Sequence, residues 1–123
     1  MKIRIFYEDT DSTGVVYHAN YIKFCDRARS SFFFDADLPI EDKGALLVHS
    51  LDCRYYSPAR LGDIIDVKTT ISEIKKASIR LKQEIFLNKR VIFELNIKLV
   101  YVIDGKPSKF PEYMTKLFQK IGA

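Results

Sequence analysis

The chain has 123 residues and a mass of 14.3 kDa, which is the size of one domain with its own hydrophobic core. Hydrophobic residues make up 47% of it and charged residues 29%, a balance that argues against disorder. The net charge of +4 favours an anionic partner, but charge alone does not choose between nucleic acid, an anionic membrane and a phosphorylated small ligand.

The cysteines and the apolar runs exclude several classes of protein. Cys25 and Cys53 are too few for a secreted disulfide scaffold and lie in no CxxC or histidine-rich motif, so we expect reduced thiols packed in the core. The first residues reach Glu8 and Asp9 before any apolar stretch long enough for a signal peptide. No stretch approaches the roughly 20 apolar residues of a membrane span. The sequence predicts one cytoplasmic domain over residues 1–123, without stable membrane insertion and without metal-ligand spacing.

The first predicted element is a short strand over residues 2–8, in which the apolar residues Ile3, Ile5 and Tyr7 alternate with their neighbours. The turn-forming run EDTDSTG follows and ends at Gly14. Residues 20–34 then change to a helical period. The apolar stripe of this helix consists of Tyr21, Phe24, Cys25, Ala28 and Phe32. Further apolar residues widen the stripe, so the helix needs cover on more than one side.

The remainder of the chain is predicted to form mainly strands. Residues 35–44 are predicted as a loop in which Pro39 opens a turn of helix. Alternation of apolar and polar residues then continues between turn-forming runs at 61–63, 88–89 and 104–105. The predicted elements are strands over 45–56, 65–71, 79–87 and 93–103, in hairpin succession, and a terminal helix over 111–121.

This order of elements predicts an α+β fold. Strands with one polar face indicate an antiparallel sheet that is covered on one side, and the single apolar helix is available to cover it. We therefore expect a curved antiparallel sheet of about five strands wrapped around one long central helix. Its long strands leave exposed edges, and two sheets pairing edge to edge in a dimer would cover them.

The candidate chemistry lies in the segment YEDTDSTGVVYHANY, residues 7–21, which joins the first strand to the helix. It carries Glu8, Asp9 and Asp11, and it places His18 beside a helix N-terminus. N–H groups at a helix start can stabilise negative charge on a carbonyl oxygen, and a facing carboxylate can act as a base or a nucleophile. The same residues also fit turn and capping roles without any chemistry, and spacing alone leaves both interpretations open.

The run YEDTDSTGVVYHANYIKFCDRAR resembles the signature of the 4-hydroxybenzoyl-CoA thioesterase family, in particular its Tol-Pal-associated (YbgC-type) acyl-CoA thioesterases. The shared features are an acidic-Thr-Asp run, a turn with Gly, Val-Val-Tyr-His, Asn-Tyr and an Arg on the helix. In this chain they stand at residues 9–11, 14, 15–18, 20–21 and 27. The resemblance implies the hotdog fold for the whole chain. It also implies hydrolysis of an acyl-CoA thioester to a free acid and CoA, with no cofactor beyond the CoA of the substrate.

By position, the resemblance implies that Asp11 is the catalytic carboxylate and that the backbone amide of His18 polarises the thioester carbonyl. Asp11 would attack the carbonyl carbon or activate a water, and an orienting or proton-transfer role for the His18 imidazole stays open. Asp9 is expected to shape the turn rather than take part in the chemistry. The residues expected along the substrate in this segment are Tyr7, Gly14, Val15 and Tyr17, of which Tyr7 also shapes the turn.

A second candidate site is the basic turn between two predicted strands. The resemblance implies that Lys75, Lys76 and Ser78 contact the phosphates of coenzyme A, while Ala77 replaces a third basic residue. This weaker clamp predicts further contacts from Arg54, Arg60 or a neighbouring subunit. Without the resemblance, a pair of lysines in a hairpin would be a solvated turn.

We expect the partners to be an acyl-CoA and further copies of the chain, as a homodimer or homotetramer. A hotdog dehydratase is one alternative, although the spacing from the Asp-Thr-Asp run to His18 fits the thioesterases better. A non-catalytic acyl-CoA-binding module is another, and the complete acidic turn argues against it. No strand motif that combines aromatic and basic residues favours nucleic acid. Chain-length preference, dimer against tetramer, and the pathway are beyond the sequence.

Overall fold

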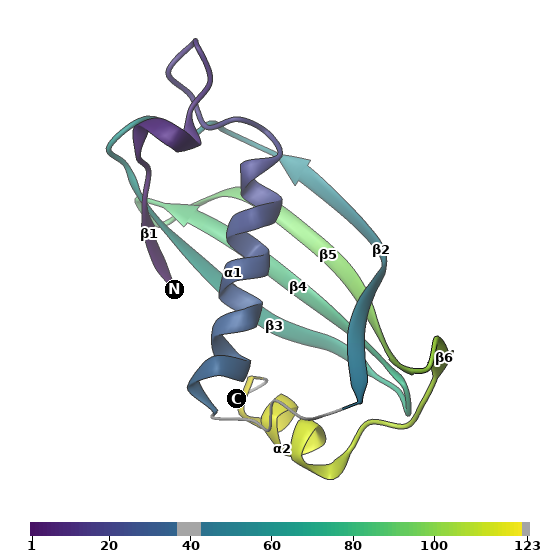
Figure 1. The fold of residues 1–123 in the computed structure, drawn as a ribbon. Helices are drawn as coiled ribbons and strands as arrows, with labels where there is room; N and C mark the ends of the chain where they lie inside the picture. Colours follow the sequence, from purple (N-terminus) through teal and green to yellow (C-terminus); the bar gives the residue numbers. More distant parts are fainter. Residues whose placement is uncertain (37–42, 122–123) are drawn as a thin grey trace.

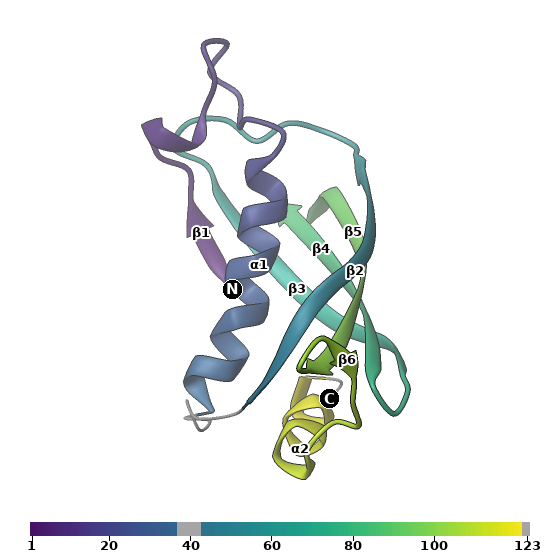
Figure 2. The ribbon, with the colours of Figure 1, turned by 45° about the vertical axis from the view of Figure 1, so that its right-hand side comes forward.

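The fold of the computed structural model is an antiparallel sheet wrapped around one long helix (Figures 1 and 2). The structure describes residues 1–36 and 43–121, so the helical turn predicted at Pro39 lies outside the described residues. The strands are β1 (Lys2–Arg4), β2 (Gly44–Tyr55), β3 (Ile64–Ile74), β4 (Ser78–Leu87), β5 (Arg90–Ile103) and β6 (Lys106–Pro107). The helices are η1, a 3-10 turn at Tyr7–Asp9, α1 (Asn20–Asp35) and α2 (Glu112–Ile121).

Helix α1 lies across the concave face of the sheet (Figure 2). The buried side chains Tyr21, Phe24, Cys25 and Ala28 repeat at helical spacing and face the core. The predicted α+β hotdog arrangement and the helix predicted over residues 20–34 are confirmed. The cysteine of this stripe is fully buried, and burial raises the pKa of the Cys25 thiol to about 12. At neutral pH this thiol is therefore an uncharged packing group.

The predicted strands over 65–71, 79–87 and 93–103 are confirmed as the centre of the sheet. Alternate residues of β4 and β5 are buried against α1 and α2, so the polar residues between them face outward. The tight connection from β4 to β5 has Asn88 at φ 51° and Lys89 at φ 67°. These are the positive φ angles that a two-residue hairpin turn requires.

The prediction that the four long strands pair in hairpin succession is wrong for the first of them, β2. The sheet order is β1-β3-β4-β5-β2, with β6 also paired to β5, so β2 lies at an edge and pairs with β5 rather than with β3. Alternation in a sequence shows which residues face the core but not which strand lies alongside. The connection over residues 56–63 therefore crosses from β2 at one edge of the sheet to β3, the neighbour of β1 on the other side, past the start of α1 (Figure 1).

The opening strand is shorter than predicted. It ends at Arg4, because the Asp9 carboxylate accepts a hydrogen bond from the Phe6 N–H at 2.8 Å and closes the 3-10 turn over Tyr7–Asp9. The turn leaves Tyr7 82% exposed, so this side chain does not continue the buried alternation of Ile3 and Ile5.

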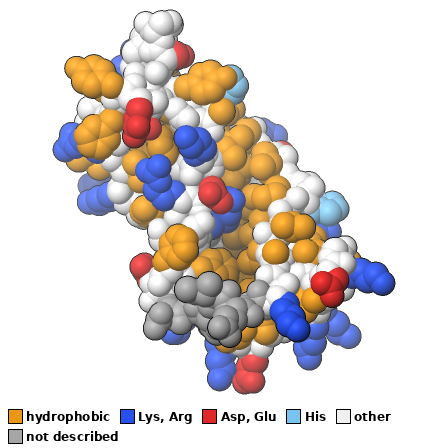
Figure 3. All heavy atoms as spheres, viewed as in Figure 1, with side chains coloured by type: hydrophobic (Ala, Val, Ile, Leu, Met, Phe, Trp, Pro, Cys, Tyr) orange, Lys and Arg blue, Asp and Glu red, His pale blue; other side chains and the backbone are white. Residues whose placement is uncertain are grey.

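The inner face of β2 is apolar but is left open by α1. A register shift between Val48 and Ser50 makes His49 the extra residue of a β-bulge. The β2 residues opposite the buried residues of β5 are Leu46, Val48, Leu51, Cys53 and Tyr55, and directly opposite residues share a face. Of these, Val48 is 53% exposed and Leu51 39% exposed. Figure 3 shows hydrophobic side chains gathered between α1 and β2. We call the surface formed by these five inner-face residues of β2 the β2 strip.

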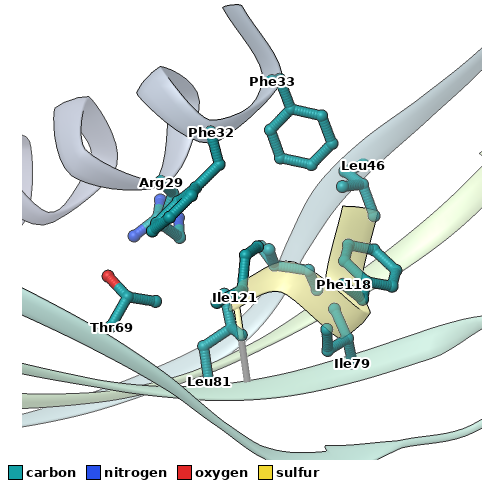
Figure 4. Close-up of a pocket in the computed structure, with 10 residues that line it drawn as sticks. Arg29, Phe32, Phe33, Leu46, Thr69, Ile79, Leu81, Phe118 and Ile121 are labelled. Carbon is teal, nitrogen blue, oxygen red and sulfur yellow. The ribbon is translucent and has the colours of Figure 1, made fainter. Parts of the chain in front are cut away.

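The other end of the core is closed by α2. Phe118 and Ile121 of this helix reach under the C-terminal half of α1, beside Phe33 and Leu46 (Figure 4). The cavity that remains there has a volume of about 10 Å³, which is room for about one water. In the described part of the chain, no helix has the length and apolar character needed to cross a membrane.

Candidate active site

The acidic turn is a tight loop held at both ends by backbone hydrogen bonds. Thr10 and Val16 form an antiparallel bridge, the Asp11 N–H donates to the Val15 carbonyl at 3.0 Å, and the Gly14 N–H donates to the Asp11 carbonyl at 3.1 Å. Gly14 has φ 82°, a conformation that residues with a Cβ rarely adopt. The loop projects from the end of the molecule where α1 begins (Figure 1).

The Asp11 carboxylate is exposed and is oriented by Thr13. Its Oδ1 accepts hydrogen bonds from the Thr13 hydroxyl at 2.5 Å and from the Thr13 N–H at 2.8 Å. These bonds, the hydroxyl first, lower the pKa of Asp11 below its usual range, because they stabilise the charged form. The turn role and a chemical role are thus compatible. Oδ1 holds the turn, while Oδ2 has no hydrogen-bond partner among residues 1–36 and 43–121.

The start of α1 presents an unused N–H group. The N-cap residue Ala19 has no capping side chain, and among the described residues nothing accepts a hydrogen bond from the His18 N–H. The Asn20 N–H donates to the Tyr17 carbonyl at 2.9 Å. That carbonyl and the His18 N–H belong to one trans peptide and point in opposite directions. The His18 N–H is therefore directed away from the helix, as a donor to an oxygen outside it.

Two contacts join the acidic turn to the helix start. The Asp9 carbonyl accepts hydrogen bonds from the Tyr17 N–H at 3.0 Å and from the Asn20 side-chain amide at 2.8 Å. The His18 imidazole is exposed, and the centre of its ring lies 4.5 Å from that of Tyr17. The structure thus brings the Asp11 turn and the His18 amide to the same end of the molecule.

The residues predicted along the substrate in this segment lie around the same turn. Gly14 and Val15 are half-buried, and Val15 forms an antiparallel bridge with Arg60 of the 56–63 connection. Tyr17 is 47% exposed at the helix start. Tyr7 lies on the 3-10 turn, and its side chain is exposed to solvent.

The basic turn lies at the opposite end of the molecule from the Asp11 turn (Figure 1). Lys75, Lys76 and Ser78 stand at the connection of β3 to β4, and β3 spans 11 residues, a length of roughly 35 Å. The Lys75 N–H donates to the Ser78 carbonyl at 2.8 Å, and the Lys75 ammonium lies 3.8 Å from the Glu73 carboxylate. One chain alone therefore does not bring these lysines to the Asp11 turn.

Sequence reasoning missed three residues that hold this site. Thr13 orients Asp11, the Asn20 side chain holds the Asp9 carbonyl, and the Tyr55 hydroxyl donates to the His18 carbonyl at 2.7 Å. A threonine two residues after an aspartate is a recognisable turn signal, and Asn20 lies within the matched run. Nothing in the sequence connects Tyr55 to His18, because the contact depends on where β2 ends in space.

Comparisons with known proteins place this site in a family. The pattern of the thioesterase-like superfamily matches residues 7–118. The chain belongs to the thioesterase-like superfamily. The acyl-CoA thioesterase YbgC of Helicobacter pylori is 37% identical to this chain, and the match covers 98% of this chain and 97% of the Helicobacter protein. One of Haemophilus influenzae is 35% identical over 97% and 93%.

The solved structures agree with this assignment. A crystal structure of a probable thioesterase from Bartonella henselae has a TM-score of 0.83 and 28% identity, covering 90% of this chain and 97% of that one. The resemblance to YbgC-type thioesterases that the acidic run indicates is thus confirmed over nearly the full length. The Asp11 turn and the start of α1 lie inside the matched region of this superfamily member.

Proposed function

We propose that the protein hydrolyses acyl-CoA thioesters to a free carboxylic acid and CoA. The observation that carries this proposal is the pairing of an exposed, ionised carboxylate at Asp11 with an unused N–H at His18, on one end of the fold. Hydrolysis of a thioester needs these two elements, a nucleophile or base and a donor to the carbonyl oxygen. The names of the relatives and the family assignment support the same reaction.

The thioester carbonyl oxygen would accept a hydrogen bond from the His18 N–H, which strengthens as negative charge develops on that oxygen. In one route an Asp11 oxygen bonds to the acyl carbon, the carbon–sulfur bond breaks, and water then hydrolyses the resulting anhydride. In the other route Asp11 removes a proton from a water that attacks the same carbon. In both, the sulfur leaves as a thiolate and is protonated by solvent. When water attacks the Asp11 carboxyl carbon of the anhydride, a single turnover in H₂¹⁸O places ¹⁸O in the Asp11 side chain, which the general-base route does not do.

The β2 strip supports an apolar acyl group as the other half of the substrate. Its upper end is Tyr55, whose hydroxyl lies 2.7 Å from the His18 carbonyl oxygen, and it continues down β2 past Leu51 to Val48. An acyl chain that leaves the His18 amide in this direction buries apolar surface, at roughly 25 cal/mol per Å². No cofactor is needed for these steps, and a free CoA thioester as substrate supports a cytoplasmic location.

Assembly through the β2 edge would complete the site. Among the described strands β2 has a neighbour on one side only, and an unpaired edge can pair with the same strand of a second copy. Antiparallel pairing about a two-fold axis reverses the second sheet. The connection that bears the partner's Lys75 then lies at the end of the first copy where Asp11 projects. We propose that these lysines contact the CoA phosphates across a homodimer, whose formation light scattering measures.

Changing Lys75→Ala together with Lys76→Ala then has a specific effect. The loss of two charges should raise KM for an acyl-CoA several-fold, because each phosphate contact is charge-assisted. An acyl-pantetheine lacks the nucleotide, so its kcat/KM should not change. Lys89→Ala, on a different connection, is the matched control. An equal loss with both substrates contradicts the role of these lysines.

The decisive experiment compares wild type, Asp11→Asn and Glu8→Gln on short, long and aromatic acyl-CoAs. Both changes remove one charge from an exposed residue of the segment between β1 and α1. We expect Asp11→Asn to lower kcat by about 10²-fold or more and Glu8→Gln to have little effect. Undiminished turnover in Asp11→Asn would remove the role of Asp11. Hydration of an enoyl-CoA without hydrolysis would favour a dehydratase instead.

A further inference from the structure

Tyr55 joins the sheet to the start of α1. It is the last residue of β2, and Figure 1 shows this end of the strand meeting the beginning of the helix. Its hydroxyl donates to the His18 carbonyl at 2.7 Å. Its ring packs edge-on against Phe93, at 4.9 Å between centroids, and against Tyr21, at 5.6 Å. The ring is thus fixed from two elements, which fixes the direction of the hydroxyl.

The backbone that Tyr55 holds is otherwise weakly restrained. In the described structure no side chain caps the helix at Ala19, and the bond from the Lys23 N–H to the Ala19 carbonyl is long at 3.4 Å. No N–H of the described first turn reaches the His18 carbonyl, so the Tyr55 hydroxyl is the donor that this oxygen has there. The remaining bonds at this point, to Asp9 and Tyr17, are local to the segment.

We propose that Tyr55 is a positioning residue that sets the direction of the His18 N–H through the adjoining His18 carbonyl. The inference rests on the proposed thioesterase function. The Tyr55 hydroxyl bonds to the His18 carbonyl and does not itself touch the reacting atoms of the substrate. A fixed donor is effective because it needs no reorganisation as the oxyanion forms. The His18 N–H belongs to the preceding peptide, which the Asn20 N–H holds through the Tyr17 carbonyl at 2.9 Å. The Tyr55 bond holds the peptide on the other side of the His18 Cα, so its loss lets that Cα shift and the His18 N–H miss the carbonyl oxygen.

The hydroxyl keeps its proton over the working range of the enzyme. Although the residue is 47% exposed, burial first and the nearby Cys53 second raise the pKa of Tyr55 to about 12. The Tyr55 hydroxyl therefore keeps its proton for the hydrogen bond to His18 across the neutral pH range in which Asp11 is ionised. Loss of the hydroxyl should change the rate without changing the shape of the pH profile.

Tyr55→Phe tests the inference, because it removes the hydroxyl and keeps the ring that packs on Phe93 and lines the β2 strip. Tyr56→Phe is the matched control, since the Tyr56 hydroxyl donates to Glu94 at 3.2 Å, away from α1. We expect Tyr55→Phe to lower kcat by roughly 10-fold, with KM within about twofold of wild type and an unchanged pH profile. Tyr56→Phe should match wild type in all three.

A second measurement detects the hydrogen bond without catalysis. The Ala19 amide nitrogen belongs to the same peptide as the His18 carbonyl, so its ¹⁵N chemical shift should move in Tyr55→Phe and stay in Tyr56→Phe. An unchanged kcat in Tyr55→Phe overturns the inference whether or not the shift moves, and so does a rise in KM with kcat unchanged. If the wild type hydrolyses no acyl-CoA, the proposed function fails and takes the inference with it.

Discussion

Gln83 is buried between α1 and the sheet, and its replacement by leucine measures how strongly polar contacts hold these two layers together. The side chain is fully buried on β4. Its oxygen accepts a hydrogen bond from the Arg29 guanidinium at 2.8 Å. Its nitrogen donates to the Cys25 carbonyl at 2.9 Å and to the Thr69 hydroxyl at 3.0 Å. Figure 4 shows Arg29 and Thr69 facing one another at the edge of the small cavity.

The cost of Gln83→Leu follows from the groups that it leaves without a partner. Arg29 is 8% exposed and keeps its ion pair with Asp26 at 3.1 Å, but one of its buried N–H groups loses its partner. The Cys25 carbonyl keeps its helical hydrogen bond and loses its second donor. Each unsatisfied buried group costs about 1–3 kcal/mol, and the leucine recovers roughly 1 kcal/mol through its apolar surface. The half-buried Thr69 hydroxyl can bond to water. We expect a net loss of about 3 kcal/mol, or roughly 10 °C in Tm.

Urea unfolding at one fixed protein concentration measures this loss, because a dimer's stability depends on concentration. Gln119→Leu on the exposed face of α2 is the matched control and should stay within about 0.5 kcal/mol of wild type. Adding Arg29→Met to Gln83→Leu should cost less than the sum of the two single changes, since the pair is removed together. A Gln83→Leu variant as stable as wild type, or strict additivity in the double variant, would refute the reasoning.

Two further predictions concern the acidic turn. Thr13→Val removes the bond that most lowers the pKa of Asp11, so the carboxyl should protonate at higher pH and the acid limb of kcat/KM should move upward, while Thr10→Val leaves it in place. A limb that stays fixed in Thr13→Val contradicts an ionised Asp11 in the reaction. Gly14→Ala and Gly105→Ala both place a Cβ at positive φ, 82° and 76°, and should each cost about 1 kcal/mol in urea unfolding. Only Gly14→Ala should lower kcat, and equal kcat values in the two variants would separate the turn geometry from catalysis.

The sequence predicts the parts of the fold that are set by burial of one face. α1 and the three central strands repeat their apolar residues at periods of 3.6 and 2, and the structure has them where these patterns place them. The end of β1 was missed because it depends on the Asp9 side chain bonding to the Phe6 N–H. The position of β2 was missed because a facing pattern carries no information about the neighbouring strand.

The candidate site divides in the same way. A continuous run of residues identifies Asp11 and His18, since a contiguous motif survives without knowledge of the fold. Tyr55 comes from a strand 37 residues away from His18, and its role appears only when the end of β2 is placed beside α1. The separation of the lysine connection from the Asp11 turn is also a property of three dimensions. It turns a predicted local clamp into a proposed contact between two copies.

The bulge at His49 decides which face of the first half of β2 lines the β2 strip. Ser50 pairs with Lys98 and Val48 pairs with Leu99, so His49 is a residue that the ladder passes over. If His49 were instead paired regularly, Leu47 would replace Val48 on the inner face, because side chains alternate with a period of two. The end of the strand at Tyr55 would keep its place beside the helix. Loss or retention of one bulge can thus remodel the far end of the acyl-facing surface and leave the reacting end intact.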